Sequence, residues 1–237
     1  MSEWKQKRFW KEASVEQLAS GFSILLDGRA VKTPAKAALV VPTALMAQAL
    51  AGEWQAQEDV VNPLTMPFTR SANAAIDKVI PQQIEVTEMV AAYGDSDLLC
   101  YRAGQPDSLI ARQKDIWDPY LDWAAEIYDA RLFERAGLMH EPQPKAALER
   151  LKAPLDQMSA FEMAAMHDLV SLTGSLVLGL AAARDFQNPK DIWSASRLDE
   201  IWQAEQWGQD EEAEQTASHK EAAFLHAKAF FDSAQLN

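Results

Sequence analysis

The chain has 237 residues, a formal net charge of −13 and a sequence pI near 4.7. Hydrophobic residues make up 48% of the chain and charged residues 24%, which is ordinary globular usage and excludes a disordered or fibrous protein. The negative charge opposes binding to nucleic acid and to anionic membranes, so we expect a basic or neutral partner.

The N-terminal ten residues carry Lys5, Lys7 and Arg8 but no apolar run behind them. A secretory signal needs such a run, so we expect a cytoplasmic bacterial protein. The lone Cys100 fits this reducing compartment, because one cysteine cannot form an internal disulfide. The longest apolar stretch, residues 169–183, is too short and too polar to insert across a membrane.

A β-hairpin is predicted close to the N-terminus. Apolar side chains recur at every second position of residues 22–27, and Asp27-Gly28 supplies the two positive-φ residues of a type I′ turn. The return strand is expected over residues 29–32 and a further short strand over residues 38–41. Proline follows each of these strands closely and ends it.

One helix is predicted within this β-rich region, over residues 43–57. Its apolar face carries Met46, Ala49, Leu50 and Trp54. We therefore expect Trp54 to be a structural core residue, and its replacement by a charged residue to unfold the protein.

The segment 62–67 contains two prolines and marks a change in organisation. The predicted class is α+β, with a small β-rich antiparallel domain at residues 1–65 and a larger, mostly helical domain at residues 66–237. One short strand is expected at residues 98–102. Helices are predicted at residues 70–79, 82–93, 106–130, 144–152, 160–183, 189–206 and 209–233.

Three of these helices carry recognisable local signals. Ser159 and Glu162 form a capping box, in which each side chain accepts a hydrogen bond from a free backbone amide of the first turn. Asn188-Pro189 supplies an N-cap and a proline at the first helical position. Pro119 either kinks its helix or divides it, with Asp118 capping the second part.

A polar stripe formed by Arg70, Asn73 and Asp77 lies on one face of the helix predicted after the boundary. One interpretation is a solvated face. The other is a structural network that holds the two halves of the chain together, since arginine suits bidentate pairing with carboxylates. The candidate partners are Asp95, Asp97 and Arg102.

Glu205 follows Leu198, Ile201 and Trp202 at helical offsets, in line with an apolar stripe. Either the stripe simply ends in solvent, or Glu205 lies at the rim of an apolar surface that meets a client protein. The second interpretation gives a candidate client-binding set: Trp202, Glu205, Trp207, Asp210, Glu211 and Glu212, with Glu214 on the same acidic run.

No catalytic pattern accompanies these carboxylates. The glycines do not form a phosphate-binding loop, so neither nucleotide nor another cofactor is expected. The histidines have no metal-ligand spacing, and His167 and Asp168 are adjacent on a helix with no nucleophile motif. We therefore expect no catalytic residues and no metal site. The alternative is a metal-dependent or hydrolytic enzyme that uses Glu205, His167 or residues 210–214.

Five blocks in order, residues 21–36, 41–57, 62–77, 97–102 and 207–213, resemble one known family. It is the family of assembly chaperones of the ATP synthase catalytic head whose client is the alpha subunit, the "Atp-twelve" type. The resemblance implies a non-enzymatic protein that shields the free alpha subunit and releases it to the beta subunit. It also implies a role for an acidic residue of the late segment, and the mitochondrial matrix as the matching compartment in organelles.

Overall fold

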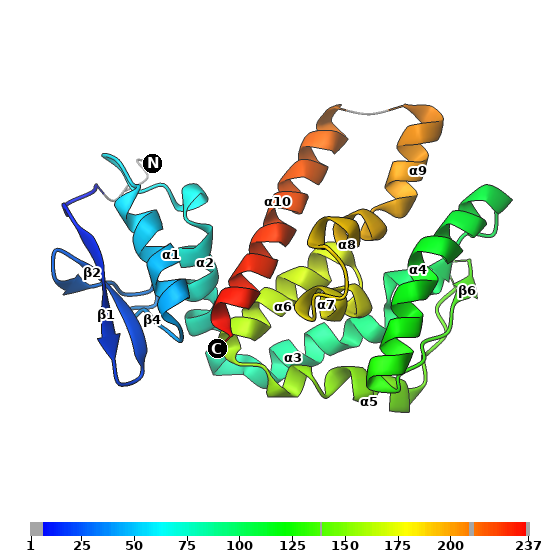
Figure 1. Ribbon diagram of the computed structural model, residues 1–237, viewed down its shortest axis with the longest axis horizontal. Coiled ribbons are helices and arrows are strands. Elements are labelled where there is room, and N and C mark those ends of the chain that lie inside the picture. The colour runs from blue at the N-terminus through cyan, green and yellow to red at the C-terminus, as the bar shows by residue number, and fades with distance from the viewer. Residues whose placement is uncertain (1–6, 138, 209–210, 236–237) are drawn as a thin grey trace. The chain divides into compact units, whose positions relative to one another are not determined.

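The structure, a computed structural model, describes residues 7–137, 139–208 and 211–235 (Figure 1). It confirms the α+β class, with a small antiparallel sheet followed by helices. The chain forms two compact units: Met1–Gln83 with Ser159–Ala165 and Ala229–Asn237, and Ile84–Met158 with Met166–Lys228. The first unit thus extends past residue 65, where the sequence placed a boundary, and includes two later segments.

The sheet is built around one central strand. β1 (Ala13–Leu18) pairs antiparallel with β2 (Gly21–Leu26) along its whole length. β3 (Arg29–Ala30) and β4 (Val40–Val41) both pair antiparallel with β2 at its other edge. The sheet therefore has four strands, of which the sequence predicted all but β1.

The predicted turn between β2 and β3 is confirmed. Asp27 has φ 48° and Gly28 has φ 78°, as a type I′ turn requires. The return strand is shorter than expected, although Lys32 and Ala38 form an isolated bridge beyond it. The Asp27 carboxylate also accepts the amide hydrogen of Glu12 at 2.9 Å, which fixes the entry into β1.

The first unit continues with helices. α1 begins after Thr43, whose hydroxyl accepts the amide hydrogen of Met46 at 3.1 Å. Its buried side chains include Met46, Leu50 and Trp54, which confirms the predicted apolar face. The elements that follow the sheet here are α1 (Ala44–Gln55), η1 (Pro63–Thr65), α2 (Pro67–Ala74), the π-helical turn η2 (Ala75–Val79) and η3 (Ile80–Gln82).

The later part of the chain is helical, as predicted. The expected strand at residues 98–102 is only two residues long, and it pairs with a second short strand in parallel. The elements are α3 (Gln83–Ala92), η4 (Tyr93–Ser96), η5 (Leu98–Cys100), β5 (Tyr101–Arg102), α4 (Asp107–Tyr128), β6 (Arg135–Ala136), α5 (Lys145–Lys152), η6 (Leu155–Gln157), α6 (Ala160–Thr173), α7 (Leu176–Ala183), α8 (Pro189–Ser196), α9 (Leu198–Trp207) and α10 (Glu211–Ala234).

The single helix predicted over residues 160–183 is wrong, because the chain breaks it into α6 and α7. Gly174 has φ 69°, a left-handed conformation that ends α6, and the hydroxyl of Ser175 caps α7 by accepting the amide hydrogen of Leu178 at 3.0 Å. The capping box at the start of α6 is confirmed: Ser159 and Glu162 exchange hydrogen bonds of 2.8 and 3.2 Å.

The helix predicted over residues 189–206 is also divided. Asn188 caps α8 as expected, accepting the amide hydrogen of Lys190 at 2.9 Å. α8 ends at Ser196, and α9 begins at Leu198. Arg197, between them, has φ −108° and ψ 16°. Of the two alternatives at Pro119, division of the helix is wrong, because α4 is continuous through this proline.

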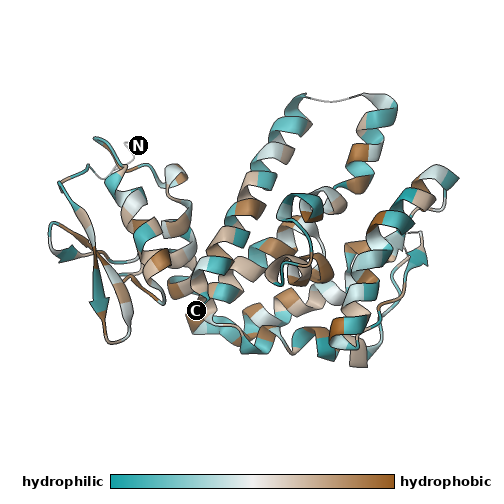
Figure 2. Ribbon diagram, viewed as in Figure 1, coloured by the Kyte–Doolittle hydropathy of each residue, from teal (hydrophilic) through white to brown (hydrophobic). Residues whose placement is uncertain are grey.

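Two helices of this region, α7 and α10, differ in burial. Residues 176–182 of α7 are buried throughout, and Figure 2 shows α7 in the hydrophobic colour. Residues 211–216 of α10 are exposed on every side, and the start of α10 is coloured from hydrophilic to neutral. None of the helices in the described ranges is both long and apolar enough to cross a membrane.

Candidate functional site

Glu205, in the last turns of α9, forms an ion pair with Arg112 of α4. Arg112 Nη1 and Nη2 donate to Glu205 Oε2 and Oε1 at 2.5 and 3.0 Å, which is bidentate geometry. This hydrogen bonding lowers the pKa of the Glu205 carboxyl and raises the pKa of Arg112. The Glu205 carboxylate therefore has a charged partner in the folded protein, and the ion pair links α9 to α4.

A second polar link joins the start of α9 to the same helix. Gln113 is only 1% exposed. Its Nε2 donates to Asp199 Oδ1 at 2.7 Å, and its Oε1 accepts the amide hydrogen of Ala103 at 2.8 Å. A buried side-chain amide needs such partners. Adjacent residues of α4, Arg112 and Gln113, thus hold both ends of α9.

The helix α8 and the loop before it are also fastened to α4. Trp117 Nε1 donates to the carbonyl oxygen of Ala195 at 2.8 Å, and the hydroxyl of Tyr120 donates to Gln187 Oε1 at 2.8 Å. Trp117 and Tyr120 are 0% and 2% exposed. Both aromatic rings are therefore core residues that position α8.

An open groove of about 350 Å³ lies between the three helices α4, α8 and α9. Apolar side chains from all three helices line it, together with charged and polar groups at its rim. The lining residues are Arg112, Asp115, Ile116, Pro119, Tyr120, Gln187, Asp191, Ser194, Ala195, Leu198 and Ile201. The Arg112–Glu205 ion pair thus lies at the edge of this groove.

The predicted client-binding residues divide between α9 and α10. Trp207 is 79% exposed at the end of α9, whereas Trp202 is half-buried. Glu211 and Glu212 lie in the exposed first turn of α10, where negative charge stabilises the positive end of the helix dipole. Asp210 lies outside the described residues.

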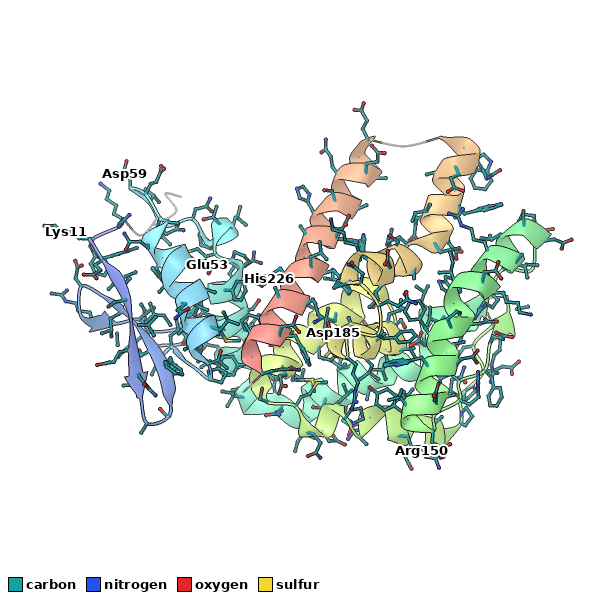
Figure 3. The ribbon with its side chains drawn as sticks, viewed as in Figure 1. Lys11, Glu53, Asp59, Arg150, Asp185 and His226 are labelled. Carbon is teal, nitrogen blue, oxygen red and sulfur yellow. The ribbon has the colours of Figure 1, made fainter. Side chains whose placement is uncertain are left out.

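Glu53 and Gln57, near the end of α1, both accept backbone hydrogen bonds from the chain that follows the helix. The Glu53 carboxylate accepts the amide hydrogens of Phe68 and Thr69 at 2.6 and 2.8 Å, so it caps α2 (Figure 3). Burial raises the pKa of Glu53, although these hydrogen bonds act in the opposite direction. Gln57 Oε1 accepts the amide hydrogen of Asn62 at 2.7 Å. These contacts fix the chain where α1 turns towards α2.

Trp54 is a core residue, as predicted. It is 9% exposed and packs edge-to-face on Trp10, with ring centroids 5.3 Å apart. Trp54 Nε1 is buried, and none of the described residues accepts a hydrogen bond from it. Its contribution is therefore hydrophobic packing.

The partners expected for the polar stripe need correction. Asp77 accepts hydrogen bonds from the Thr33 hydroxyl at 2.6 Å and the Ala35 amide at 3.0 Å, within the first unit. Arg70 is exposed, and among the described residues nothing donates to the buried Oδ1 of Asn73. The sequence could not identify the partners because Thr33 lies 44 residues before Asp77.

Asp97 is fully buried and organises the start of α7. Its Oδ1 accepts the amide hydrogen of Leu99 at 3.1 Å, and its Oδ2 accepts that of Val177 at 3.0 Å. Burial raises its pKa to about 6, against the opposing effect of these hydrogen bonds. Asp97 is thus a structural residue, with partners inside the second unit.

Arg102 also has partners different from those expected. Its Nη2 pairs with Asp118 at 2.8 Å and with Glu134 at 3.5 Å. Its Nε donates to the Leu99 carbonyl oxygen at 2.7 Å, and its guanidinium carbon lies 5.3 Å from the Trp117 ring centroid. Asp118 therefore pairs with Arg102 instead of capping a divided helix.

Those residues of the enzyme alternative that the structure describes are not assembled into a site. His167 Nδ1 lies 3.0 Å from Asp168 Oδ1, and the hydrogen bond that His167 donates to this carboxylate raises the pKa of His167. Burial raises the pKa of the Cys100 thiol, which disfavours the reactive thiolate. Among residues 7–137, 139–208 and 211–235, no three His, Cys, Asp or Glu side chains gather as a metal site.

The sequence missed the α4 half of this surface. Arg112 and Gln113 lie 93 and 86 residues before their partners, so no local pattern connects them. A signal was available for Gln113, because a polar residue next to the apolar positions of an amphipathic helix needs a hydrogen-bond partner.

Comparison with known proteins agrees with this fold. The family model described as ATP12 chaperone protein matches residues 7–125. The mitochondrial protein atp12 of Schizosaccharomyces pombe is 24% identical over 219 residues, covering 87% of this chain and 75% of that protein. The crystal structure of Atp12 from Paracoccus denitrificans is 43% identical, with a TM-score of 0.95, and the match covers 98% of this chain and all of that one.

A mutant of the Paracoccus protein, in which lysine replaces an aspartate, has also been solved. It matches with the same TM-score of 0.95 and the same 43% identity, over 99% of this chain and 100% of that one. The family model covers half of the chain and the structural match covers almost all of it, and this chain belongs to the ATP12 chaperone protein family.

Proposed function

We propose that this protein is an assembly chaperone of ATP synthase that binds the unassembled alpha subunit of the catalytic head. It shields the surface that the beta subunit later covers, and it releases the alpha subunit when the beta subunit arrives. This role needs no turnover of a small molecule and takes place in the bacterial cytoplasm. The observation that carries the proposal is the similarity to Atp12 over 98% of the chain at 43% identity.

The surface around α9 suits a client. It offers the exposed ring of Trp207, the half-buried ring of Trp202 and the apolar groove that α9 lines with Leu198 and Ile201. Glu205 pairs with Arg112, which lines the same groove. Specific interfaces concentrate their binding energy in aromatic anchors of this kind. The net charge of −13 also favours encounter with a basic client.

Mass action is sufficient for the shielding step. A protein that binds only the free subunit at about one hundred times its Kd stabilises that subunit by roughly 2.7 kcal/mol. The concentration of free alpha subunit that can aggregate falls accordingly. The beta subunit then displaces the chaperone by burying more surface.

The enzyme alternative has no observation in its favour. The Glu205 carboxylate is engaged by Arg112, and the carboxylates of the described residues do not gather around a metal position.

Co-purification tests the proposal. The protein is mixed with separately expressed alpha or beta subunits from the same source, and the missing subunit is then added. We expect retention of alpha but not beta, and release of alpha when beta is added. Retention of beta alone, or of neither subunit, would contradict the assigned client.

A matched pair of variants locates the contact. Trp207→Ala is expected to weaken retention of the alpha subunit, since it removes an exposed aromatic anchor. Leu64→Ala, at a side chain that is 80% exposed, is expected to leave retention unchanged. Equal retention by both variants would place the contact elsewhere on the protein.

A further inference from the structure

The groove between α4, α8 and α9 has an uneven charge. Arg112 is the only cation among its lining residues, and Glu205 already neutralises it through the bidentate ion pair. Two carboxylates remain at the rim, Asp115 from α4 and Asp191 from α8. Both are exposed, and within the described part of the chain neither forms an ion pair. The groove therefore has a net negative charge.

The floor of the groove is apolar. Ile116, Leu198 and Ile201 contribute aliphatic side chains, and Ile201 is 36% exposed. The groove has a volume of about 350 Å³, at the lower end of the roughly 300–1,000 Å³ that small-molecule sites occupy. A partly open hollow of this size suits a few side chains of a polypeptide segment better than an enclosed ligand.

Hydrogen bonds link the walls of the groove. The hydrogen bonds of Trp117 to Ala195 and of Tyr120 to Gln187 hold α8 in place. Tyr120 and Asp191 both line the groove. Burial and, to a smaller extent, the negative charge of Asp191 raise the pKa of Tyr120 to about 12. A preformed groove needs little rearrangement to bind, which favours affinity.

A second hollow, of about 380 Å³, shows the contrast. It is lined by residues of α4 and of the segment 131–134, and each of its charged side chains has an ion-pair partner. Arg131 pairs with Asp122 at 2.7 Å, and Asp118 pairs with Arg102 at 2.8 Å. This second hollow therefore leaves fewer unpaired charges to attract a ligand.

We infer that the groove of α4, α8 and α9 binds a segment of the client polypeptide in which a lysine or arginine is flanked by apolar residues. The apolar side chains pack on Ile116, Leu198 and Ile201, and the cation lies between Asp115 and Asp191. This inference rests on the proposed function, because the client is the alpha subunit. Charge complementarity decides the occupant, since an acidic segment would meet two carboxylates with no free cation in the lining.

The first experiment removes the two charges. The Kd for purified alpha subunit is measured at 50 and 300 mM NaCl for the wild type and for Asp115→Asn/Asp191→Asn. Exposed charge pairs contribute modestly each, so we expect binding about tenfold weaker at low salt. The difference should shrink at high salt, because salt screens exposed charges.

The matched control is Glu126→Gln/Glu149→Gln, which removes two exposed carboxylates from α4 and α5, away from the groove. It is expected to bind as the wild type does, and both double variants to keep the wild-type melting temperature. If the groove variant binds within twofold of the wild type, or if the control weakens binding equally, the inference is wrong. The proposed function stands in either case, whereas absence of binding by the wild type would remove both.

The second experiment locates the segment. Ser194→Cys, at an exposed rim position, is labelled with a benzophenone and irradiated in the presence of alpha subunit. Ser171→Cys, an exposed serine of α6, is the control. We expect cross-linking from position 194 but not from position 171, and a cross-linked peptide with a basic residue among apolar ones. A cross-linked peptide that is acidic, or equal cross-linking from both positions, would overturn the inference.

Discussion

The carboxylate of Asp97 accepts the backbone amide hydrogen of Val177, 80 residues later in the chain, at 3.0 Å. This bond ties the short turn η5 to the first turn of the buried helix α7. Asp97 is 0% exposed, and burial raises its pKa to about 6 from 3.8. The folded protein therefore binds a proton at Asp97 more tightly than the unfolded chain does.

This shift predicts a pH-dependent stability difference. The stabilising contribution of protonated Asp97 is fully present below pH 3.8 and is lost as the pH rises to about 6. Relative to Asp97→Asn, which does not titrate, the free energy of unfolding of the wild type should fall by about 2–3 kcal/mol across this window. Urea denaturation at pH steps between 4 and 7 measures the difference.

At pH 4, where the wild-type stability is highest relative to the variant, the Asn variant is expected to be the less stable protein. Its amide group presents hydrogens towards backbone amides that now donate to a carboxylate, which costs about 1–3 kcal/mol. Glu149→Gln, at an exposed position of α5, controls for the loss of one carboxylate. A constant stability difference between wild type and Asp97→Asn from pH 4 to 7 would refute the assigned shift.

Reversal of charge at Glu205 should affect client binding more than stability. Glu205 is exposed, and ion pairs at exposed positions contribute little, so Glu205→Lys should change the melting temperature by less than about 3 °C. Retention of the alpha subunit should fall by at least about tenfold, because reversal removes a carboxylate from the rim and unpairs Arg112. Differential scanning fluorimetry and a binding titration provide the two measurements.

A charge swap separates two roles of the same ion pair. In Arg112→Glu/Glu205→Arg the link between α4 and α9 is restored with opposite polarity. If Glu205 contacts the client, binding stays weak in the swapped protein. Full recovery of binding would instead show that the pair only positions α9.

Truncation of Trp54 should cost stability directly. Trp54→Ala removes a ring that is 91% buried, since its exposed fraction is 9%, and leaves a cavity beside Trp10. We expect a loss of about 3–5 kcal/mol in the free energy of unfolding, measured by urea denaturation. Trp54→Phe keeps most of the volume and should lose clearly less. Equal losses in both variants would contradict a packing role.

The contact of α6 with α7 depends on Gly179. A Cβ atom at this position would lie 2.5 Å from Val170 Cγ2 and 3.1 Å from Met166 Cε. The branched Val170 side chain has little rotamer freedom in a helix, so Gly179→Ala should destabilise the protein by about 1–3 kcal/mol. Thermal unfolding measures the effect.

Gly104→Ala is the matched control for this substitution. Nothing lies within 4 Å of a Cβ atom at Gly104, so alanine there should be neutral or slightly stabilising through the unfolded state. If the two alanine variants unfold at the same temperature, the close approach at Gly179 is not a constraint on packing.

Local signals predicted the local structure well. The Asp27-Gly28 turn, the Ser159–Glu162 capping box and the Asn188 cap each depend on neighbouring residues, and each is present. The strand β1 was missed because four of its six residues are exposed, so Ala13–Leu18 has no clear apolar face. The alternation that identifies a strand requires one buried face.

Local signals did not reveal the break in the long apolar helix. They also did not reveal hydrogen bonds between residues that are far apart in the sequence. The apolar pattern continues from α6 into α7, and the two helices are separated by the backbone conformation of Gly174 and the Ser175 cap. Side-chain partners depend on how the chain folds back on itself. This is why Asp97 and Glu205 were selected from the sequence while Val177 and Arg112, which bond to them, were not.

The last helix, α10, places the rings of Phe230 and Phe231 in the compact unit that also contains the N-terminal sheet. Phe230 lies 5.8 Å from Phe68, centroid to centroid, and the Thr43 hydroxyl donates to the Ser233 carbonyl oxygen at 2.5 Å. A ribosome must therefore translate past residue 233 before the first-made part of the protein can close its interior. During synthesis the nascent N-terminal region therefore lacks part of its hydrophobic core. It becomes stable only when the last turns of α10 have been made and pack against it.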